Sequence, residues 1–277
     1  DYRQIAAKNI LPRLGKRNID EVERVEVVRL IDRVATRAPI LANRTLGLLK
    51  QFFDWAIGRG DIAMNPALGI PKAMKETPRE RILSLTEMRN IYSAASHLSP
   101  ANKLFIQMLL LTGQRSGVIA KLCRTEWLDD HLEIAGERNK SGERILVPLS
   151  AIAQKKLAKV NHTNGSFLVS TTNGLKPISG FSKLKKKIDL LSGVTDWRLH
   201  DIRRGLATHF EDNGVDRFYV ERILNHKDNS VTGIYARSNH LEMRRNIFEQ
   251  WSEILTSKDG SSSENVIRFR GAKGWSA

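Results

Sequence analysis

Apolar positions recur every three to four residues in the first part of the chain, which is the period of an amphipathic α-helix. One such run extends from Ile19 to Val34, where Asp20 is a candidate N-terminal cap. A second run begins near Asn43 and stops at Gly58-Arg59-Gly60, since glycine suits the left-handed backbone that ends a helix. The apolar positions of the two runs are Val22, Val25, Val28, Ile31, Val34, Leu46, Leu49, Phe52, Phe53 and Ile57. Residues 1–70 are therefore predicted to form a helical domain.

A loss of periodicity marks the end of this domain. Residues 71–83 contain two prolines and mixed charge, which is typical of a linker. Ser84 and Glu87 then have the spacing of a capping box and predict the start of a helix. A second domain is predicted over residues 84–257. The tail at 258–277 is rich in Lys, Asp, Gly and Ser and is expected to be flexible.

The apolar period changes from helical to alternating between residues 131 and 148. Leu132 and Ile134 alternate with polar residues, and Ile145 and Val147 do the same after a turn at 139–142, so a β-hairpin is predicted. Helical periods cover 102–123 before the hairpin and 181–190, 200–213, 215–224 and 241–255 after it. The basic run at 181–190 has its apolar residues at Phe181, Leu184, Ile188 and Leu190. The predicted fold class is mainly α with a small antiparallel β-sheet.

Charge points to a polyanionic partner. The 277 residues include 45 Lys and Arg against 30 Asp and Glu, a net charge of +15. Nucleic acid is the first candidate and an anionic membrane surface the second, while a merely soluble basic protein is the alternative. No apolar run approaches the roughly eighteen residues of a membrane span. Cys123 is the single cysteine, which excludes an intramolecular disulfide and fits a reducing cytoplasm.

Basic residues gather in the first domain, in the linker and in the 181–190 helix. Contacts with DNA phosphates would position the protein on a duplex without reading its sequence. The alternative for each residue is an ordinary solvated face. The candidate DNA contacts are Arg44, Lys50, Lys72, Lys75, Arg79, Arg81, Lys183, Lys185, Lys186 and Lys187.

The candidate chemistry lies near the C-terminal end. His200 and Arg203 are three residues apart and share one helix face, and His226 and Tyr235 follow. The chain has no phosphate-binding glycine loop, no His-Glu-x-x-His and no obvious two-metal carboxylate site. What remains is a metal-free cationic pocket in which arginines could clamp a phosphate and a tyrosine could attack it. No cofactor is expected.

Six positions in order resemble the tyrosine recombinase, or phage integrase, family, and the resemblance is greatest to integrases of prophages and genomic islands. They are Arg115 within Thr112-Gly113-Gln114-Arg115-Ser116-Gly117, Lys140 in the hairpin turn, His200 and Arg203, His226 within Leu224-Asn225-His226, and Tyr235. The segment from Ala42 to Pro66 resembles the core-binding domain of that family. The resemblance implies a helical core-binding domain joined to an α+β catalytic domain.

The same resemblance implies a function and a role for each residue. Arg115 and Arg203 would bind the scissile phosphate, and Lys140 would protonate the leaving 5′-oxygen. His200 would assist proton transfer, His226 would hydrogen-bond a non-bridging oxygen, and Tyr235 would form a 3′-phosphotyrosine bond. Members of the family recombine DNA at attachment sites as tetramers on two duplexes, without metal or ATP. DNA-bending or directionality proteins assist some of them.

Two departures and two alternatives accompany this interpretation. Family members often carry an acid where this chain has Val118, so Glu126 or Glu137 is a candidate partner for Arg115. Asn225 replaces the usual glycine, and asparagine tolerates a left-handed backbone. A catalytically silent DNA-binding protein of the same fold and a type IB topoisomerase-like nicking enzyme are the alternative functions. The DNA target, the preferred direction of recombination and an arm-binding domain upstream stay open.

Overall fold

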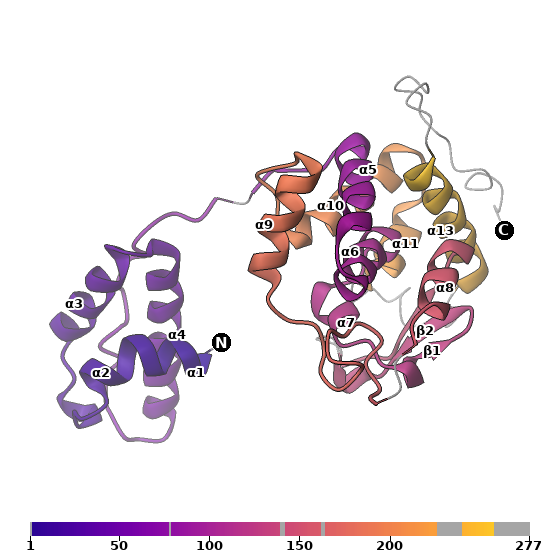
Figure 1. Ribbon diagram of the computed structural model, residues 1–277. Helices are drawn as coiled ribbons and strands as arrows, with labels where there is room; N and C mark the ends of the chain where they lie inside the picture. Colours follow the sequence, from indigo (N-terminus) through magenta and orange to yellow (C-terminus); the bar gives the residue numbers. More distant parts are fainter. Residues whose placement is uncertain (1, 78, 139–141, 162–163, 226–239, 258–277) are drawn as a thin grey trace. The chain divides into compact units, whose positions relative to one another are not determined.

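The computed structural model describes residues 2–77, 79–138, 142–161, 164–225 and 240–257, and the chain divides into two compact units, Asp1–Glu80 and Arg81–Ala277 (Figure 1). Lys140, His226 and Tyr235, three of the six predicted catalytic residues, lie outside the described residues, as does the predicted tail at 258–277. Each unit has its own apolar core. In the described ranges no helix is both long enough and apolar enough to cross a bilayer.

The first unit is helical, and its core lies between two helices whose apolar sides pack against each other. They are α3 (Arg24–Ala35) and α4 (Pro39–Gly58). The short elements α1 (Tyr2–Ile5), π-helical η1 (Ala6–Ile10), α2 (Leu11–Leu14) and 3-10 helical η2 (Ile19–Glu21) precede them in the chain. Buried residues of α3 pack with Leu46, Leu49 and Phe53 of α4. Gly60 has φ of 80°, which confirms the predicted left-handed end of α4.

The predicted details of α3 were partly wrong. Asp20 lies in η2 and does not cap the helix; Glu23 does, in a capping box with Glu26. Val25 is 44% exposed, and the buried residues are Val27, Leu30, Ile31 and Val34. The predicted apolar positions were spaced three residues apart. Because an α-helix has 3.6 residues per turn, side chains at that spacing drift around the helix and cannot all face one side.

In α4 the predicted start and two predicted core residues also differ from the structure. The helix begins at Pro39, because proline is well suited to the first helical position, where its missing N–H costs nothing. Phe52 and Ile57 are 45% and 38% exposed.

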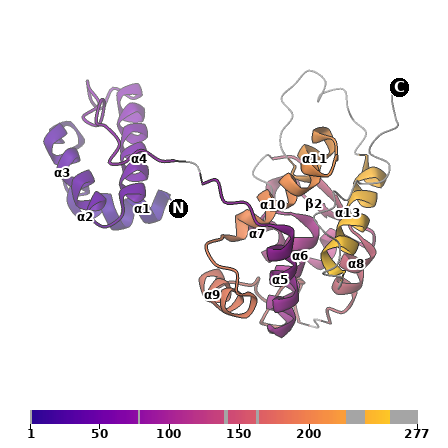
Figure 2. The same ribbon diagram turned by 90° about the horizontal axis from the view of Figure 1, so that it is seen from above.

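The second unit is organised around α6 (Pro100–Thr112), in which every residue from Leu104 to Thr112 is buried. This helix contacts α5 (Leu85–Ala94), α7 (Ser116–Ala120), α8 (Ala151–Ala158), α10 (Leu199–Asp212) and α13 (Leu241–Thr256), and Figures 1 and 2 show it among them. The remaining elements are α9 (Phe181–Ser192), α11 (Arg217–Ile223), and the 3-10 turns η3 (Ala95–His97), η4 (Arg124–Glu126) and η5 (Gly136–Arg138).

A three-stranded antiparallel sheet lies at the edge of this unit. Its order is β1 (Trp127–Leu128), β2 (His131–Ile134) and β3 (Ile145–Pro148), so the predicted hairpin is β2 with β3. Leu132 pairs with Val147 and Ile134 with Ile145, and all four are buried as the alternation predicted. Strand β1 was missed because two residues carry no readable period. The mainly helical fold with a small antiparallel sheet is confirmed.

The structure shows which apolar residues of two later helices, α9 and α13, are buried. In α9, Leu184 and Ile188 are buried, but Leu190 is 85% exposed, so its predicted place on the apolar side was wrong. The apolar face of α13 packs into its own unit, where the Trp251 indole donates to the Leu110 carbonyl at 2.7 Å. Arg89 adds a forked bond, since Nε and Nη2 both donate to the Ile254 carbonyl at 2.9 and 2.8 Å.

The capping box that opens α5 provides a test of local stability. The Ser84 hydroxyl accepts from the Glu87 N–H at 3.2 Å, and the Glu87 carboxylate accepts from the Ser84 N–H at 2.9 Å. We predict that Ser84→Ala lowers the free energy of unfolding of the second unit by about 1 kcal/mol. The measurement is urea unfolding followed by tryptophan fluorescence. Ser93→Ala, at an exposed position of the same helix, is the control and should change it by less than about 0.5 kcal/mol.

Candidate active site

The site is built at a junction of three chain segments that a single buried arginine holds together. Arg203 of α10 is 4% exposed, and its Nη1 donates to the Gly113 carbonyl at 2.9 Å. Its Nη2 donates to the carbonyl of Leu224, directly after α11. A buried guanidinium without such acceptors would be costly, so these bonds fix the α6–α7 turn, α10 and the end of α11 relative to one another.

A glycine allows the α6–α7 turn to come close to Arg203. Gly113 ends α6 with φ of 61°, and a Cβ built there would lie 3.1 Å from the Leu206 side chain. A larger residue would meet both a strained backbone and a filled space. The turn therefore brings its carbonyl to Arg203 only with glycine at this position.

Gln114 and Asn225 make a second connection across the same junction. The Gln114 amide is buried and donates to the carbonyls of Thr112 and Ile223 at 3.1 and 3.0 Å. Its Oε1 accepts from the Asn225 side chain at 2.8 Å. Asn225 has φ of 50°, the left-handed backbone that the sequence predicted for it. Unlike glycine, it also supplies a side chain that ties the end of α11 to the residue next to Arg115.

Three of the six predicted residues share one electrostatic neighbourhood. Arg115 is half-buried at the N-cap of α7, and His200 is exposed in the first turn of α10. Burial, followed by the positive charge of Arg115, lowers the pKa of Arg203 to about 10. Although His200 lies at the surface, partial burial of its ring lowers its pKa, and the charges of Arg203, Arg204 and Arg115 lower it further against the opposing effect of Asp201. The structure thus brings Arg115, His200 and Arg203 together as a concentrated positive site.

The position that often carries an acid in the family is apolar in structure as well as in sequence. Val118 is 7% exposed and belongs to the core. Glu126, one candidate substitute, pairs with Arg138 and accepts from the Cys123 N–H at 2.8 Å, so its carboxylate is occupied. No contact joins Glu137 to Arg115 in the part of the chain that the structure describes. The backbone at the N-cap of α7 sets the position of Arg115 in the chain.

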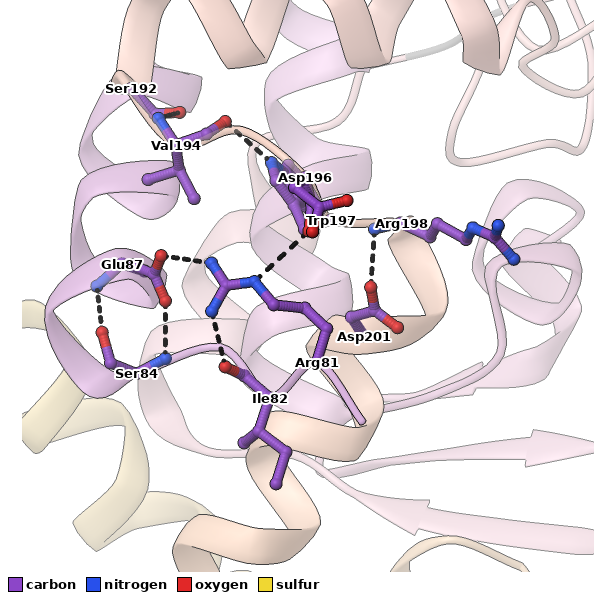
Figure 3. A network of polar contacts seen from close by, with 10 residues as sticks. All are labelled: Arg81, Ile82, Ser84, Glu87, Ser192, Val194, Asp196, Trp197, Arg198 and Asp201. Carbon is purple, nitrogen blue, oxygen red and sulfur yellow. Dashed lines mark hydrogen bonds and ion pairs between the residues drawn. The ribbon is translucent and has the colours of Figure 1, made fainter. Parts of the chain in front are cut away.

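A polar network holds the N-terminus of α10, which carries His200 and Arg203 (Figure 3). Arg81 donates from Nε to the Asp196 carbonyl at 3.3 Å and from Nη1 to the Ile82 carbonyl at 2.8 Å, and it pairs with Glu87. The Arg198 N–H donates to the Asp201 carboxylate at 2.8 Å and caps the helix. The capped α5 and the start of α10 are therefore joined through Arg81.

Backbone packing supports the same junction. Gly205 of α10 faces the chain ahead of α5, and a Cβ built on it would lie 3.1 Å from the Leu83 carbonyl oxygen. Leu83 itself is 1% exposed. The segment that enters the second unit thus lies directly against the helix of the candidate site.

Some of the predicted DNA contacts form bonds within the protein, and others are exposed to solvent. Arg81 has the internal bonds just described, the Lys50 ammonium donates to the Ile70 carbonyl at 3.0 Å, and Lys185 pairs with Asp189 and lies 4.2 Å from the centre of the Trp197 ring. Arg79 is half-buried. The exposed members of the set are Arg44, Lys72, Lys75, Lys183, Lys186 and Lys187.

Gln114, Asp201 and Arg81 support the site, and the sequence did not assign them to it. Gln114 adjoins Arg115, so its place in the motif was the available signal.

Across the described ranges, no group of three or more His, Cys, Asp or Glu side chains is arranged to hold a metal ion.

The chain is similar to known proteins over most of its length. Residues 81–242 match the model of the phage integrase family, and residues 1–73 match its central domain. The chain is 24% identical over 266 residues to prophage integrase IntZ of Escherichia coli K12, covering 92% of this chain but 65% of that protein, less than two thirds of its length. It is 25% identical to tyrosine recombinase XerD of Listeria innocua, covering 84% of this chain and 83% of that one. A lambda integrase tetramer bound to a Holliday junction has the same fold, with a TM-score of 0.65 at 22% identity over 83% of this chain and 71% of that chain.

Replacing the buried arginine should weaken the whole junction. We predict that Arg203→Lys lowers the free energy of unfolding of the second unit by about 2 kcal/mol, because an ammonium cannot span both carbonyls and charged hydrogen bonds contribute about that much. Arg204→Lys, at the half-buried neighbouring position, should change it by less than about 0.5 kcal/mol. Urea unfolding measures both. Equal losses in the two variants would contradict the bridging role.

The same helix gives a pH-dependent test. His209 stacks edge-on against Trp251 at 5.5 Å, and burial lowers its pKa, although Asp212 opposes this. The unfolded chain then binds protons more readily near pH 6.5, so the contribution of this histidine to stability is present above that pH and is lost as pH falls below it. We predict that His209→Gln flattens the fall in stability between about pH 7 and 5, measured by thermal unfolding. The exposed His97→Gln control should leave the slope unchanged.

Proposed function

The chain belongs to the phage integrase family, and we propose that it is a site-specific DNA recombinase that cuts and rejoins DNA through a 3′-phosphotyrosine intermediate. The observation that carries the proposal is the rigid cationic site at the Gly113–Arg203–Leu224 junction, with Arg115 and His200 beside it. Such a site suits a phosphodiester that gains negative charge as it is attacked.

The two arginines divide the binding of the phosphate between them. A guanidinium has five N–H donors, and the two carbonyl bonds of Arg203 leave three for a phosphate. Because Arg203 is already fixed, it stabilises the transition state without reorganising. Arg115 is more exposed and completes the clamp from the start of α7. Burial is the main cause of the lowered pKa of Arg203, and phosphate binding relieves the additional repulsion from Arg115.

His200 acts next to the clamp as a proton-transfer group. Partial burial, and after it the neighbouring arginine charges, lower its pKa and so favour the neutral imidazole, which can both accept a proton and donate a hydrogen bond. Lys140 is proposed as the general acid for the leaving 5′-oxygen, His226 as a donor to a non-bridging oxygen, and Tyr235 as the nucleophile. These three roles rest on the family resemblance of their sequence positions.

DNA is the proposed partner, and a tetramer on two duplexes is the proposed active assembly. The support is the lambda integrase relative, which was solved as a dimer on a core site and as a tetramer on a Holliday junction. The net charge of +15 fits a polyanion, and the exposed Lys183, Lys186 and Lys187 of α9 supply candidate backbone contacts. Arg44, Lys72 and Lys75 are the exposed candidates of the first unit.

A suicide substrate tests the chemistry. The protein is incubated with a nicked duplex carrying its attachment site, and a covalent protein–DNA adduct is sought on a denaturing gel. Wild-type protein should form the adduct and Tyr235→Phe should form none while binding DNA equally well. An adduct that persists in Tyr235→Phe would contradict the assignment, and no adduct with the wild-type protein would favour a catalytically silent DNA-binding protein.

The general-acid role has its own test. Lys140→Ala should slow cleavage by about a hundredfold or more and leave DNA affinity nearly unchanged. A substrate with a 5′-bridging sulfur, whose leaving group needs no proton, should restore the rate. Equal losses of binding and cleavage would count against this role. Recombinant products from two duplexes then distinguish a recombinase from a topoisomerase-like enzyme.

A further inference from the structure

A cavity of about 580 Å³ opens in the second unit between the start of α6, the end of α8 and the chain at Leu168–Ser170. Its volume is in the range of pockets that bind small molecules. Polar groups line one part of it, chiefly Lys103, Gln107, Lys156 and Lys159.

This cavity is distinct from the candidate active site. Both use α6, but the cavity takes Pro100, Lys103 and Gln107 from its first part, whereas Arg203 binds the carbonyl of Gly113 beyond its last residue. The helix has 13 residues, so its two ends are about 18 Å apart. A ligand in the cavity would therefore not touch the proposed phosphate clamp.

The cavity has an uncompensated positive charge. Three lysines line it, and none of the residues found around it is Asp or Glu. Burial lowers the pKa of the Lys156 ammonium, and the charges of Lys103 and Lys159 lower it further. No carboxylate of the described chain contributes in the opposite direction. Like charges gathered in a partly buried space are unfavourable, and an anion between them would relieve the cost.

The central lysine is held in place for such a role. The Lys156 ammonium donates to the Gln107 side-chain oxygen at 2.8 Å and lies 5.2 Å from the centre of the Tyr92 ring. Gln107 is 2% exposed, and its own amide donates to the Tyr92 carbonyl at 3.5 Å. A merely solvated lysine at a helix end behaves like its neighbour Lys155, which is exposed. The position of Lys156 is instead set by buried groups.

Another part of the cavity wall is apolar, although Ser96, Asn161 and Ser170 also line the cavity. Leu98, Leu104 and Leu168 are buried in the core and line it together with Val160. A ligand that matches both parts has an anionic group at one end and an apolar body at the other. Inorganic ions alone would leave the apolar wall without a contact.

We propose that this cavity is a binding site for a small organic anion, a phosphate or carboxylate joined to an apolar body, with Lys103, Lys156 and Lys159 around the anionic group. The site is independent of the DNA-cleavage function. It gives the second unit a place for a small-molecule effector at the far end of the helix whose other end supports the active site.

Pyridoxal 5′-phosphate is a suitable probe because it carries a phosphate, a flat aromatic ring and an aldehyde. The aldehyde condenses with a neutral lysine amine with loss of water, and sodium borohydride reduces the imine to a stable secondary amine. The full chain is labelled briefly at low probe concentration, reduced and digested, and the labelled lysines are quantified by mass spectrometry. Lys156 should be labelled about tenfold faster than the adjacent Lys155, the gain expected when two partly exposed lysines hold the phosphate.

Paired variants test the contribution of the lysines. Lys103→Met with Lys159→Met should reduce labelling of Lys156 to the rate of Lys155. Lys183→Met with Lys186→Met, which removes equal charge from α9, should leave it unchanged. Circular dichroism checks that both double variants fold. Since the measurement does not involve DNA cleavage, its result is separate from that of the suicide substrate.

Competition identifies the anion and defines the results that would overturn the proposal. Protection of Lys156 by phenyl phosphate over benzoate assigns a phosphate ligand, and the reverse assigns a carboxylate; both support the site. The proposal is overturned if the labelling rate follows solvent exposure alone, so that Lys183, Lys186 and Lys187 are labelled faster than Lys156. Protection by random-sequence duplex DNA but by neither small anion also overturns it and makes the cavity part of a DNA-backbone surface.

Discussion

The second unit depends on the burial of one positive charge. Arg203 can lie inside the protein only because two backbone carbonyls, from Gly113 and Leu224, accept its hydrogen bonds. Those carbonyls belong to segments more than a hundred residues apart, so satisfying the charge also assembles the junction. The resulting stability and the resulting chemistry are inseparable here, because the group that organises the backbone is the one proposed to bind phosphate.

Much of the fold could be predicted from local patterns. The alternation at 131–148 predicted the hairpin of β2 and β3, and the Ser84–Glu87 spacing predicted the start of α5, because both depend on neighbours in sequence. Errors occurred where the period was assumed too simply. Val25 and Leu190 carry apolar side chains but face solvent, since burial depends on which side of a helix meets its partner.

The candidate site could be predicted in its residue types but not in its supports. Arg115, His200 and Arg203 were identified through motif order, and the structure places them in one positive region. Gln114 and Arg81 were not assigned to it, because their importance lies in acceptors that are distant in sequence, the carbonyls of Ile223 and Asp196. No period or composition encodes such a tertiary acceptor. Glu126 was a candidate partner for Arg115, but it pairs with Arg138, which is also a tertiary contact that the sequence does not encode.

The packing of α13 sets a limit on where the proposed nucleophile can act. Trp251 and Arg89 lock this helix to its own unit, and Arg203 fixes the chain at Leu224. Tyr235 lies five residues before His240, and an extended chain spans at most about 3.6 Å per residue. Its Cα therefore remains within about 18 Å of His240 in any conformation. If Tyr235 attacks the phosphate bound by its own chain, its effective concentration there would be set by the length of this connection and not by the amount of protein.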